Sequence, residues 1–194
     1  MKTRFGKCSV VLLFAVVFAL FAAGAAMAMT EWELVQICRM GSAHELQGAI
    51  ARDKSFVNTR FHDQDTPLMV AADKANNPEL LQVLINAGAD VNAQNEDGET
   101  ALMKAMDEDV NPACVNVLLK AGAKVNLKED DGETALMKAL DENVAPEVII
   151  ALLDAGADAR AKDVRGRSVI GYYALRAYRI QGTEAMRRLE AAGK

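Results

Sequence analysis

The sequence predicts an all-α solenoid of about five helix–loop–helix–hairpin repeats, and two observations carry this prediction. A block of sequence returns every 34 residues: DTPLM at 65–69 recurs as ETALM at 99–103 and 133–137, and in degraded form as RSVI at 167–170. The apolar residues between these blocks have a helical rather than an alternating spacing. Such a period is typical of stacked supersecondary units, none of which can bury its apolar face alone.

Each regular period begins with a short helix. Thr66 is of the residue type that caps a helix N-terminus, and Pro67 suits the first helical position, where its missing N–H costs nothing. The alanine-rich run from 68 to 72 continues this helix and keeps it thin.

A second helix follows after a break. Asn77 is a plausible cap and Pro78 again suits the first helical position, a start that Pro112 and Pro146 repeat. Gly88 follows the helix as its C-terminal cap. The apolar columns of this helix recur at Leu80, Leu81, Leu84 and Ile85, at Cys114, Val115, Leu118 and Leu119, and at Val148, Ile149, Leu152 and Leu153.

A polar turn closes the period, and its Asp97-Gly98 pair is the local signature of a tight reversal. With this helix–loop–helix–hairpin order the chain resembles the ankyrin repeat family over essentially its whole length after residue 28. The segments that carry the resemblance are TPL at 66–68, AGAD at 87–90 and 155–158, VN at 57–58, 91–92 and 125–126, and DG at 97–98 and 131–132.

The sequence departs from the family pattern in three ways. Its period is one residue longer than the usual 33, with the extra residue in the loop between the helices, which should enlarge that loop. Gln64 stands where the family has a turn glycine. Met69, Met103 and Met137 replace the family's histidine, which should remove a side-chain hydrogen-bonding group and supply an adaptable core filler.

The first 28 residues have the composition of a secretory signal peptide. Three basic residues lie within the first seven, an apolar run extends from 10 to 21, and Ala26-Met27-Ala28 forms an A-x-A cleavage site. Cleavage after Ala28 would make the protein periplasmic or secreted. An uncleaved membrane anchor is the alternative, because apolar or small residues continue to Met29 and are long enough to span a bilayer.

The remaining residues, 29–194, suit one repeat domain with a continuous core. Its charge is uneven: 24 Asp and Glu against 10 Lys and Arg from 29 to 159 give a net of −14, whereas 3 against 9 from 160 to 194 give +6. The first repeat lacks its own hairpin and the fifth degenerates after Ile180. The expected repeats span about 30–58, 59–92, 93–126, 127–160 and 161–194.

Catalytic motifs are weak in this chain, and we expect no enzymatic activity. His44 and His62 fall on a helix start and a turn, and no nucleophile and base fall on neighbouring columns. There is no glycine-rich phosphate loop and no H-x-x-x-H or C-x-x-C pair. The acidic turns do not have the spacing of a 12-residue calcium loop. We therefore expect no cofactor, no metal and no catalytic residue.

Cys38 and Cys114 are the only thiols after residue 28, and both fall on apolar columns. These columns lie two repeats apart, and helices packed at about 8–10 Å per layer place them beyond the roughly 7 Å limit for a disulfide. We expect two buried free thiols.

Acidic residues concentrate where members of the resembled family usually bind partners, on the hairpin tips and the inner face of the first helix. Four of them lie near the C-terminal end of a first helix, where negative charge opposes the helix dipole, so stability alone would not select them. The alternative is an ordinary solvated surface. The predicted partner-binding residues, an acidic concave face, are Glu96, Asp97, Glu99, Asp107, Glu108, Asp130, Asp131, Glu133, Asp141 and Glu142.

The C-terminal end is basic and aromatic. A plain solvated cap is the default interpretation, and anionic lipid, an acidic partner or the acidic groove of another copy are the alternatives. The residues concerned are Arg165, Arg167, Arg176 and Arg179, interleaved with Tyr172, Tyr173 and Tyr178.

Together these patterns predict an exported, non-enzymatic protein–protein interaction module, a scaffold or regulator of another envelope or secreted protein. The partner would be a protein with a basic surface, not nucleic acid, with membrane contact only if the signal peptide stays uncleaved. The module itself is expected to be a monomer. A small hydrolase or redox enzyme hidden in an irregular terminal repeat, and a host-directed secreted effector that acts by binding, are the alternatives.

Overall fold

The computed structural model describes most of the chain after residue 29, and the residues from Glu31 to Lys194 form one compact unit. The predicted signal peptide, Asp107, Glu108 and Arg176 lie outside the described residues. None of the described helices is both long and apolar enough to cross a membrane. The described residues are 30–73, 77–106, 109–174 and 177–194.

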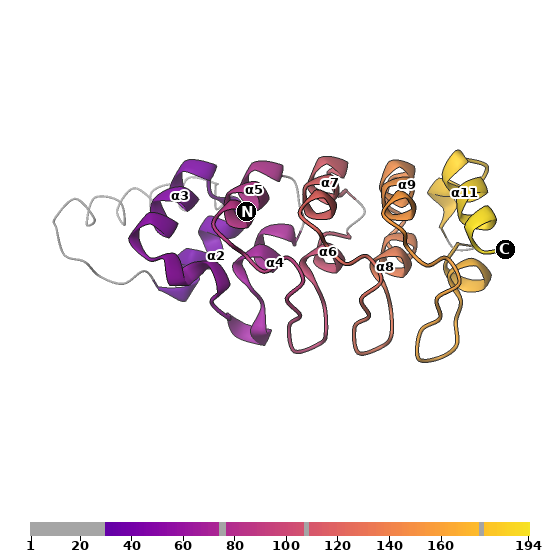
Figure 1. Ribbon diagram of the computed structural model, residues 1–194, viewed down its shortest axis with the longest axis horizontal. Helices are drawn as coiled ribbons and strands as arrows, with labels where there is room; N and C mark the ends of the chain where they lie inside the picture. The colour runs from indigo at the N-terminus through magenta and orange to yellow at the C-terminus, as the bar shows by residue number, and fades with distance from the viewer. Residues whose placement is uncertain (1–29, 74–76, 107–108, 175–176) are drawn as a thin grey trace, which may run out of the picture. The chain divides into compact units, whose positions relative to one another are not determined.

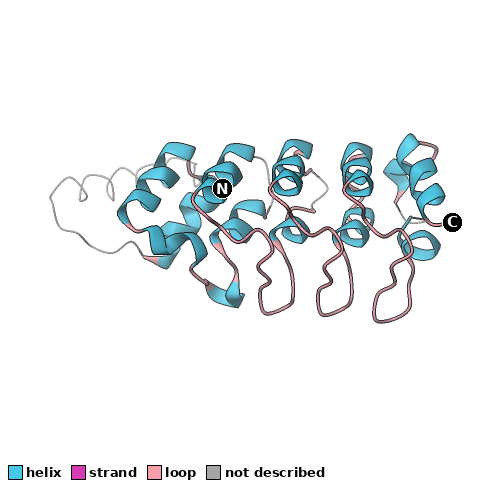
Figure 2. Cartoon of the chain, viewed as in Figure 1, coloured by secondary structure: helices cyan, strands magenta, loops and turns pink. Residues whose placement is uncertain are grey.

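Helices follow one another in antiparallel pairs that stack side by side, and a loop projects from the stack between each pair and the next (Figure 1). Within the described residues the structure has helices and loops but no strand, as Figure 2 shows. The first helices of the pairs are α2 (Glu31–Met40), α4 (Pro67–Ala72), α6 (Ala101–Lys104) and α8 (Ala135–Asp141). The second helices are α3 (Ala43–Arg52), α5 (Pro78–Asn86), α7 (Pro112–Lys120), α9 (Pro146–Asp154) and α11 (Glu184–Ala192). Shorter turns are η1 (Lys54–Asn58), η2 (His62–Gln64), the π-helical η3 (Val169–Tyr173) and η4 (Tyr178–Ile180).

The threonine that precedes each of α4, α6 and α8 acts as the N-cap of that helix, as the sequence predicts. The Thr66 hydroxyl accepts a hydrogen bond from the backbone N–H of Met69 at 3.3 Å, and Thr100 and Met103 repeat this contact. The backbone N–H of Thr66 donates in return to the Sδ of Met69 at 3.4 Å. For Met69 and Met103 the expectation that methionine removes a hydrogen-bonding group is therefore wrong, because the thioether sulfur accepts the N–H of the capping threonine.

Helices α5, α7 and α9 begin at the predicted prolines. The side chains of Asn77 and Asn111 accept hydrogen bonds from the backbone two residues ahead, whereas Ala145 offers no such cap to α9. Gly88 follows α5 with a φ of +100°, a conformation that a side chain would strain. The repeated glycine therefore ends α5, α7 and α9 and turns the chain toward the next hairpin.

The core runs through the stack as columns of leucine at the same repeat position. Leu68, Leu102 and Leu136 are at most 1% exposed, and each such side chain stabilises the fold by about 1.5–3 kcal/mol. Cys38 and Cys114 belong to this core as free thiols, which confirms the prediction. Burial raises the pKa of Cys38 to about 12 and that of Cys114 to about 11.

The recurring asparagine of the VN segment joins each repeat to the next. The Asn92 side chain donates to the carbonyl of Gly122 at 3.1 Å and accepts from the backbone N–H of Lys124 at 2.7 Å. Asn58 and Asn126 make the equivalent pairs of contacts one repeat earlier and later. This side chain therefore connects the repeats through their turns as well as through the core.

The hairpins also contact one another through their backbones. The N–H of Asp130 donates to the carbonyl of Asp97 at 3.0 Å, and the N–H of Val164 donates to the carbonyl of Asp131 at 2.9 Å. Adjacent hairpin tips are thus held side by side along one edge of the stack (Figure 1). This arrangement fixes the positions of the charged residues that the tips carry.

Candidate partner-binding site

Four of the predicted site residues lie on two neighbouring hairpin tips. Glu96 and Asp97 belong to one tip and Asp130 and Asp131 to the next, and all four are exposed. The backbone hydrogen bond from Asp130 to Asp97 holds the two tips together. We call these four residues the hairpin-tip acids.

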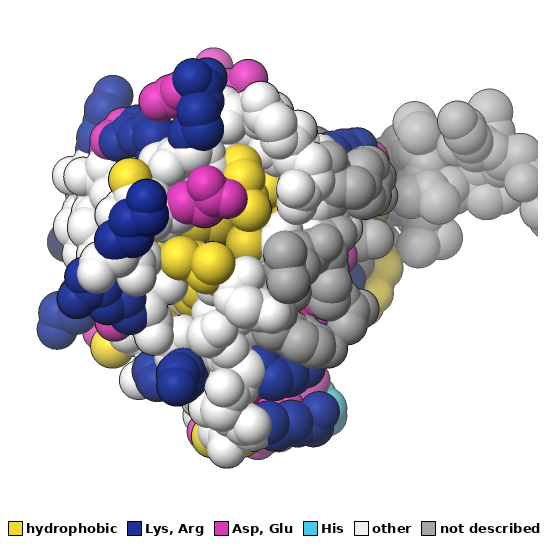
Figure 3. All heavy atoms as spheres, turned by 90° about the vertical axis from the view of Figure 1, so that its right-hand side faces the viewer, with side chains coloured by type: hydrophobic (Ala, Val, Ile, Leu, Met, Phe, Trp, Pro, Cys, Tyr) yellow, Lys and Arg dark blue, Asp and Glu magenta, His cyan; other side chains and the backbone are white. Residues whose placement is uncertain are grey.

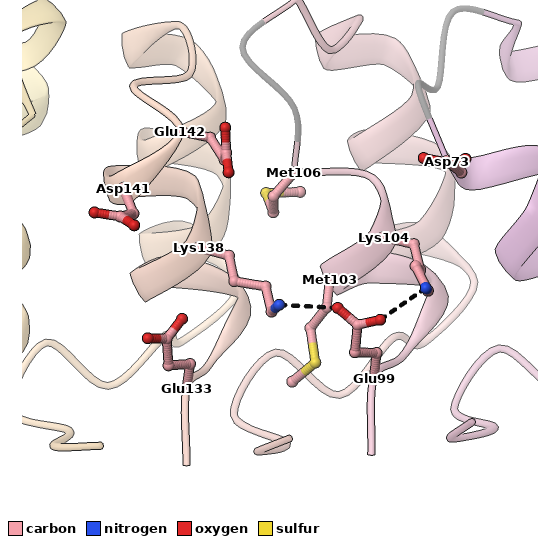
Figure 4. Close-up of a pocket in the computed structure, with 9 residues that line it drawn as sticks. All are labelled: Asp73, Glu99, Met103, Lys104, Met106, Glu133, Lys138, Asp141 and Glu142. Carbon is pink, nitrogen blue, oxygen red and sulfur yellow. Dashed lines mark hydrogen bonds and ion pairs between the residues drawn. The ribbon is translucent and has the colours of Figure 1, made fainter. Parts of the chain in front are cut away.

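Glu99 lies at the base of its hairpin, where it is paired with two lysines. Its carboxylate is 2.7 Å from the Nζ of Lys104 on α6 and 2.8 Å from the Nζ of Lys138 on α8 (Figure 4). Only 16% of the Glu99 side chain is exposed. The lysine of α8 therefore reaches back across the repeat boundary and joins the two repeats electrostatically.

This pairing changes the titration of all three groups. Burial raises the pKa of Glu99, but the hydrogen bonds from Lys104 and Lys138 outweigh it and lower the pKa to about 2. Burial lowers the pKa of the two lysines, yet the contact with Glu99 leaves both pKa values raised. Glu99 is therefore held ionised and is part of the framework of the site.

Further ion pairs extend this arrangement along the stack. Lys138 also contacts Glu129 at 3.1 Å, and Lys104 lies 3.7 Å from Asp65. One repeat later Arg167 contacts Glu133 at 3.0 Å and also pairs with the buried carboxylate of Asp163. We call this set the ion-pair belt: Asp65, Glu99, Lys104, Glu129, Glu133, Lys138, Asp163 and Arg167.

Two more predicted site residues lie at the far end of α8. Asp141 is the last residue of the helix, Glu142 is its C-cap, and both are exposed. Both carboxylates lie where the negative end of the helix dipole opposes them, as the sequence predicts. Asp107 and Glu108, which have the same repeat positions in the preceding repeat, lie outside the described residues.

A hollow lies between α6 and α8 beside the ion-pair belt. It has a volume of about 260 Å³, which is below the roughly 300–1,000 Å³ of typical small-molecule pockets. Met103 and Met106 are 2% and 6% exposed and form its apolar part. Figure 4 shows its lining residues, which are Asp73, Glu99, Met103, Lys104, Met106, Glu133, Lys138, Asp141 and Glu142.

The structure thus divides the predicted acidic face into two classes of residue. The hairpin-tip acids, Asp141 and Glu142 are exposed, whereas Glu99 and Glu133 belong to the ion-pair belt. The two lysines that pair with Glu99 were not predicted from the sequence, although Lys104 and Lys138 recur at the 34-residue spacing directly after the repeated methionine. Two bands of exposed carboxylates therefore flank a belt in which the charges are paired.

The histidines show no catalytic arrangement. His44 is exposed near the start of α3, and His62 is exposed on η2 beside Asp63, whose hydrogen bond raises the pKa of His62. Among the described residues no three His, Cys, Asp or Glu side chains are grouped as a metal ion would require.

Comparison with known proteins agrees with this architecture. The family described as ankyrin repeats, in three copies, matches residues 34–129 and again 68–163. The chain therefore belongs to the ankyrin repeat family, whose repeats generally mediate protein–protein interaction and whose members are typically non-enzymatic. No curated protein matches the chain.

Proposed function

We propose that this chain is an exported, non-enzymatic interaction module that binds the basic surface of another envelope or secreted protein and scaffolds or regulates it. The contact would use the exposed part of the acidic face, which comprises the hairpin-tip acids, Asp141 and Glu142. Asp107 and Glu108 are included by their repeat position. The belt residues Glu99 and Glu133 would support this surface from below.

One observation carries the proposal: exposed carboxylates lie on both sides of the ion-pair belt. Those at the end of α8 lie near the negative end of the helix dipole, which repels them. The helix dipole disfavours an exposed carboxylate at a helix C-terminus by about 0.3–1 kcal/mol, and this applies to both Asp141 and Glu142. Clustered charge of one sign steers a partner of opposite sign and raises its association rate. A binding role would account for carboxylates that are placed against the helix dipole.

The hollow between α6 and α8 suits one long side chain of a partner. The apolar stem of a lysine or arginine would pack on Met103 and Met106, and its charged end would lie near Asp141 and Glu142. The small volume of the hollow favours a side chain over a free ligand.

The export part of the proposal is supported by the N-terminal sequence alone. The basic start, the apolar run and Ala26-Met27-Ala28 favour cleavage after Ala28 and a periplasmic or secreted protein. Mass spectrometry of the protein recovered from cells should find a chain that starts at Met29. A chain that starts at Met1 in the membrane fraction would instead mean an uncleaved anchor.

The binding proposal is tested by capture from an envelope extract with two charge-reversed variants. The first reverses Asp130, Asp131, Asp141 and Glu142 to lysine. The second is a control that reverses Glu79 and Glu147, which are exposed on the second helices α5 and α9.

The wild-type protein and the control variant should retain the same basic protein at low salt and release it as salt rises, because exposed charges are screened over about 10 Å at 0.1 M. The first variant should lose that protein. Equal capture by both variants would contradict the proposal.

A further inference from the structure

The C-terminal end of the stack combines apolar and basic side chains. Ile170 and Met186 are only partly buried there, and Val164 is 66% exposed. Figure 3 shows apolar side chains near the centre of this end, with an acidic side chain beside them and Lys and Arg side chains mainly to the left and below. An apolar centre with a charged rim is the usual composition of a protein–protein interface.

The last hairpin differs in charge from the two hairpins before it. Where those tips carry Glu96-Asp97 and Asp130-Asp131, the last one carries Val164-Arg165. Its one carboxylate, on Asp163, is buried and accepts hydrogen bonds from the backbone N–H groups of Arg165 and Arg167. The exposed charges of this hairpin are therefore positive.

Helix α11 carries charges of both signs, and its Glu190 is exposed. Glu184 is paired with Arg187 at 3.0 Å, and Arg188 is paired with Asp154 of the preceding repeat. Lys194 is exposed just beyond the helix. Lys162, Arg165 and Lys194 are the exposed basic residues on which the positive charge of this end rests.

A complementary surface exists on the same chain. The hairpin-tip acids, Asp141 and Glu142 are exposed, and the chain from 29 to 159 has a net charge of −14. Two copies can therefore bring a basic, partly apolar end against an acidic face.

A second copy cannot extend the row of hairpins by hydrogen bonding its last hairpin to the first described hairpin of this one. In the later hairpins the backbone N–H of each tip donates to a carbonyl of the previous tip, as Val164 does to Asp131. In the first one the N–H of His62 donates to the carboxylate of Glu31 at 3.0 Å. The Glu31 carboxylate thus takes the place of the carbonyl of a preceding hairpin. The N–H of His62 is therefore already used and cannot donate to the Arg165 carbonyl of another copy.

We infer that the basic C-terminal repeat of one copy binds the acidic face of a second copy. This inference rests on the proposed function, because it uses the same acidic face. The sequence predicts a monomer, whereas the inferred contact is a reversible, heterologous association between copies. The basic repeat of one copy then competes with the external partner for the acidic face of another. The contact joins exposed charges and is therefore weakened by salt.

The test uses sedimentation velocity on protein produced from the full chain, with wild type and two charge-neutralised variants. The basic-end variant carries Lys162→Gln and Arg165→Gln. The acidic-face variant carries Asp130→Asn, Asp131→Asn, Asp141→Asn and Glu142→Gln. A control carries Lys120→Gln and Glu147→Gln, which neutralise exposed residues of α7 and α9 outside both surfaces.

Wild type and control should show a weight-average mass that rises with protein concentration at about 20 mM salt and returns to the monomer value at about 0.5 M salt. Each variant alone should remain monomeric. An equimolar mixture of the two variants should form a 1:1 dimer that grows no further, because each supplies only one of the two surfaces. A monomeric wild type at low salt, or a mixture that stays monomeric, would overturn the inference.

The same proteins separate this inference from the proposed function. A decalysine peptide serves as a basic probe of the acidic face. If wild type stays monomeric but the acidic-face variant binds decalysine several-fold more weakly than the control does, only the self-association is refuted. If the acidic-face variant and the control bind decalysine equally, the proposed function is refuted as well.

Discussion

The replacement Glu99→Gln tests whether the ion-pair belt stabilises the fold. A glutamine at this position would keep the size of the side chain but could no longer attract Lys104 and Lys138, which now lie 2.7 Å and 2.8 Å from the carboxylate. The two lysines would retain their contacts with Asp65 and Glu129. The variant should therefore fold but lose stability at neutral pH.

The magnitude follows from the pKa of Glu99, which is lowered from 4.5 to about 2 in the folded protein. A carboxylate with a lowered pKa stabilises the fold fully above pH 4.5, and this contribution disappears as the pH falls through 2. The difference corresponds to about 3 kcal/mol at pH 7, about 2 kcal/mol at pH 3.5 and less than about 1 kcal/mol at pH 2.5. The stability difference between wild type and variant should shrink in this order.

Urea unfolding at these pH values measures the difference, with Glu147→Gln as the control. Glu147 is an exposed carboxylate in the first turn of α9, so its replacement should cost less than about 1 kcal/mol at any of the three pH values. If the Glu99→Gln difference is below about 0.5 kcal/mol at pH 7, or does not change with pH, the ion pairs of Glu99 do not stabilise the fold.

Three further predictions concern the framework. Asn92→Ala removes two hydrogen bonds between repeats and should lower the free energy of unfolding by about 1–3 kcal/mol, whereas Asn116→Ala, on the exposed side of α7, should cost nothing in the same urea titration. Gln64 has a φ of +60°, so Gln64→Gly should raise the thermal midpoint by a few degrees, and an unchanged or lower midpoint would contradict the assigned strain. Cys38 and Cys114 should react with a thiol reagent only after denaturation, because burial raises both pKa values, and rapid labelling of the native protein would contradict their place in the core.

Much of the fold can be predicted from the sequence because the same residue types start and end the helices of each regular repeat. Thr66 and Pro67 start a helix, Asn77 and Pro78 start the next, and Gly88 ends it, through short-range rules that need no knowledge of the rest of the chain. The burial of both thiols follows from the same periodicity.

The role of the repeated methionine was less predictable. A thioether is a weak acceptor, and only the three-residue spacing within the cap brings the sulfur of Met69 to the N–H of Thr66.

The site was predicted only in part because ion pairing depends on contacts between repeats. Glu99 and Asp97 look alike in the sequence, yet one lies at a hairpin base beside two lysines and the other on a tip. Lys138 is 39 residues from Glu99, so their contact becomes visible only when the repeats are stacked. Charge patterns along the chain indicate the sign of a surface but not which charges are already paired.

Binding of a basic partner by the exposed acids is measured by the rate at which the captured protein associates with this chain. We expect Asp130→Lys, Asp131→Lys, Asp141→Lys and Glu142→Lys together to slow association by at least about tenfold at low salt, since steering by clustered charge changes on-rates by 10–10³. The fold should remain intact, because lysine at the end of α8 complements the helix dipole. An unchanged association rate in a variant that is still folded would mean that the exposed acids do not bind the partner.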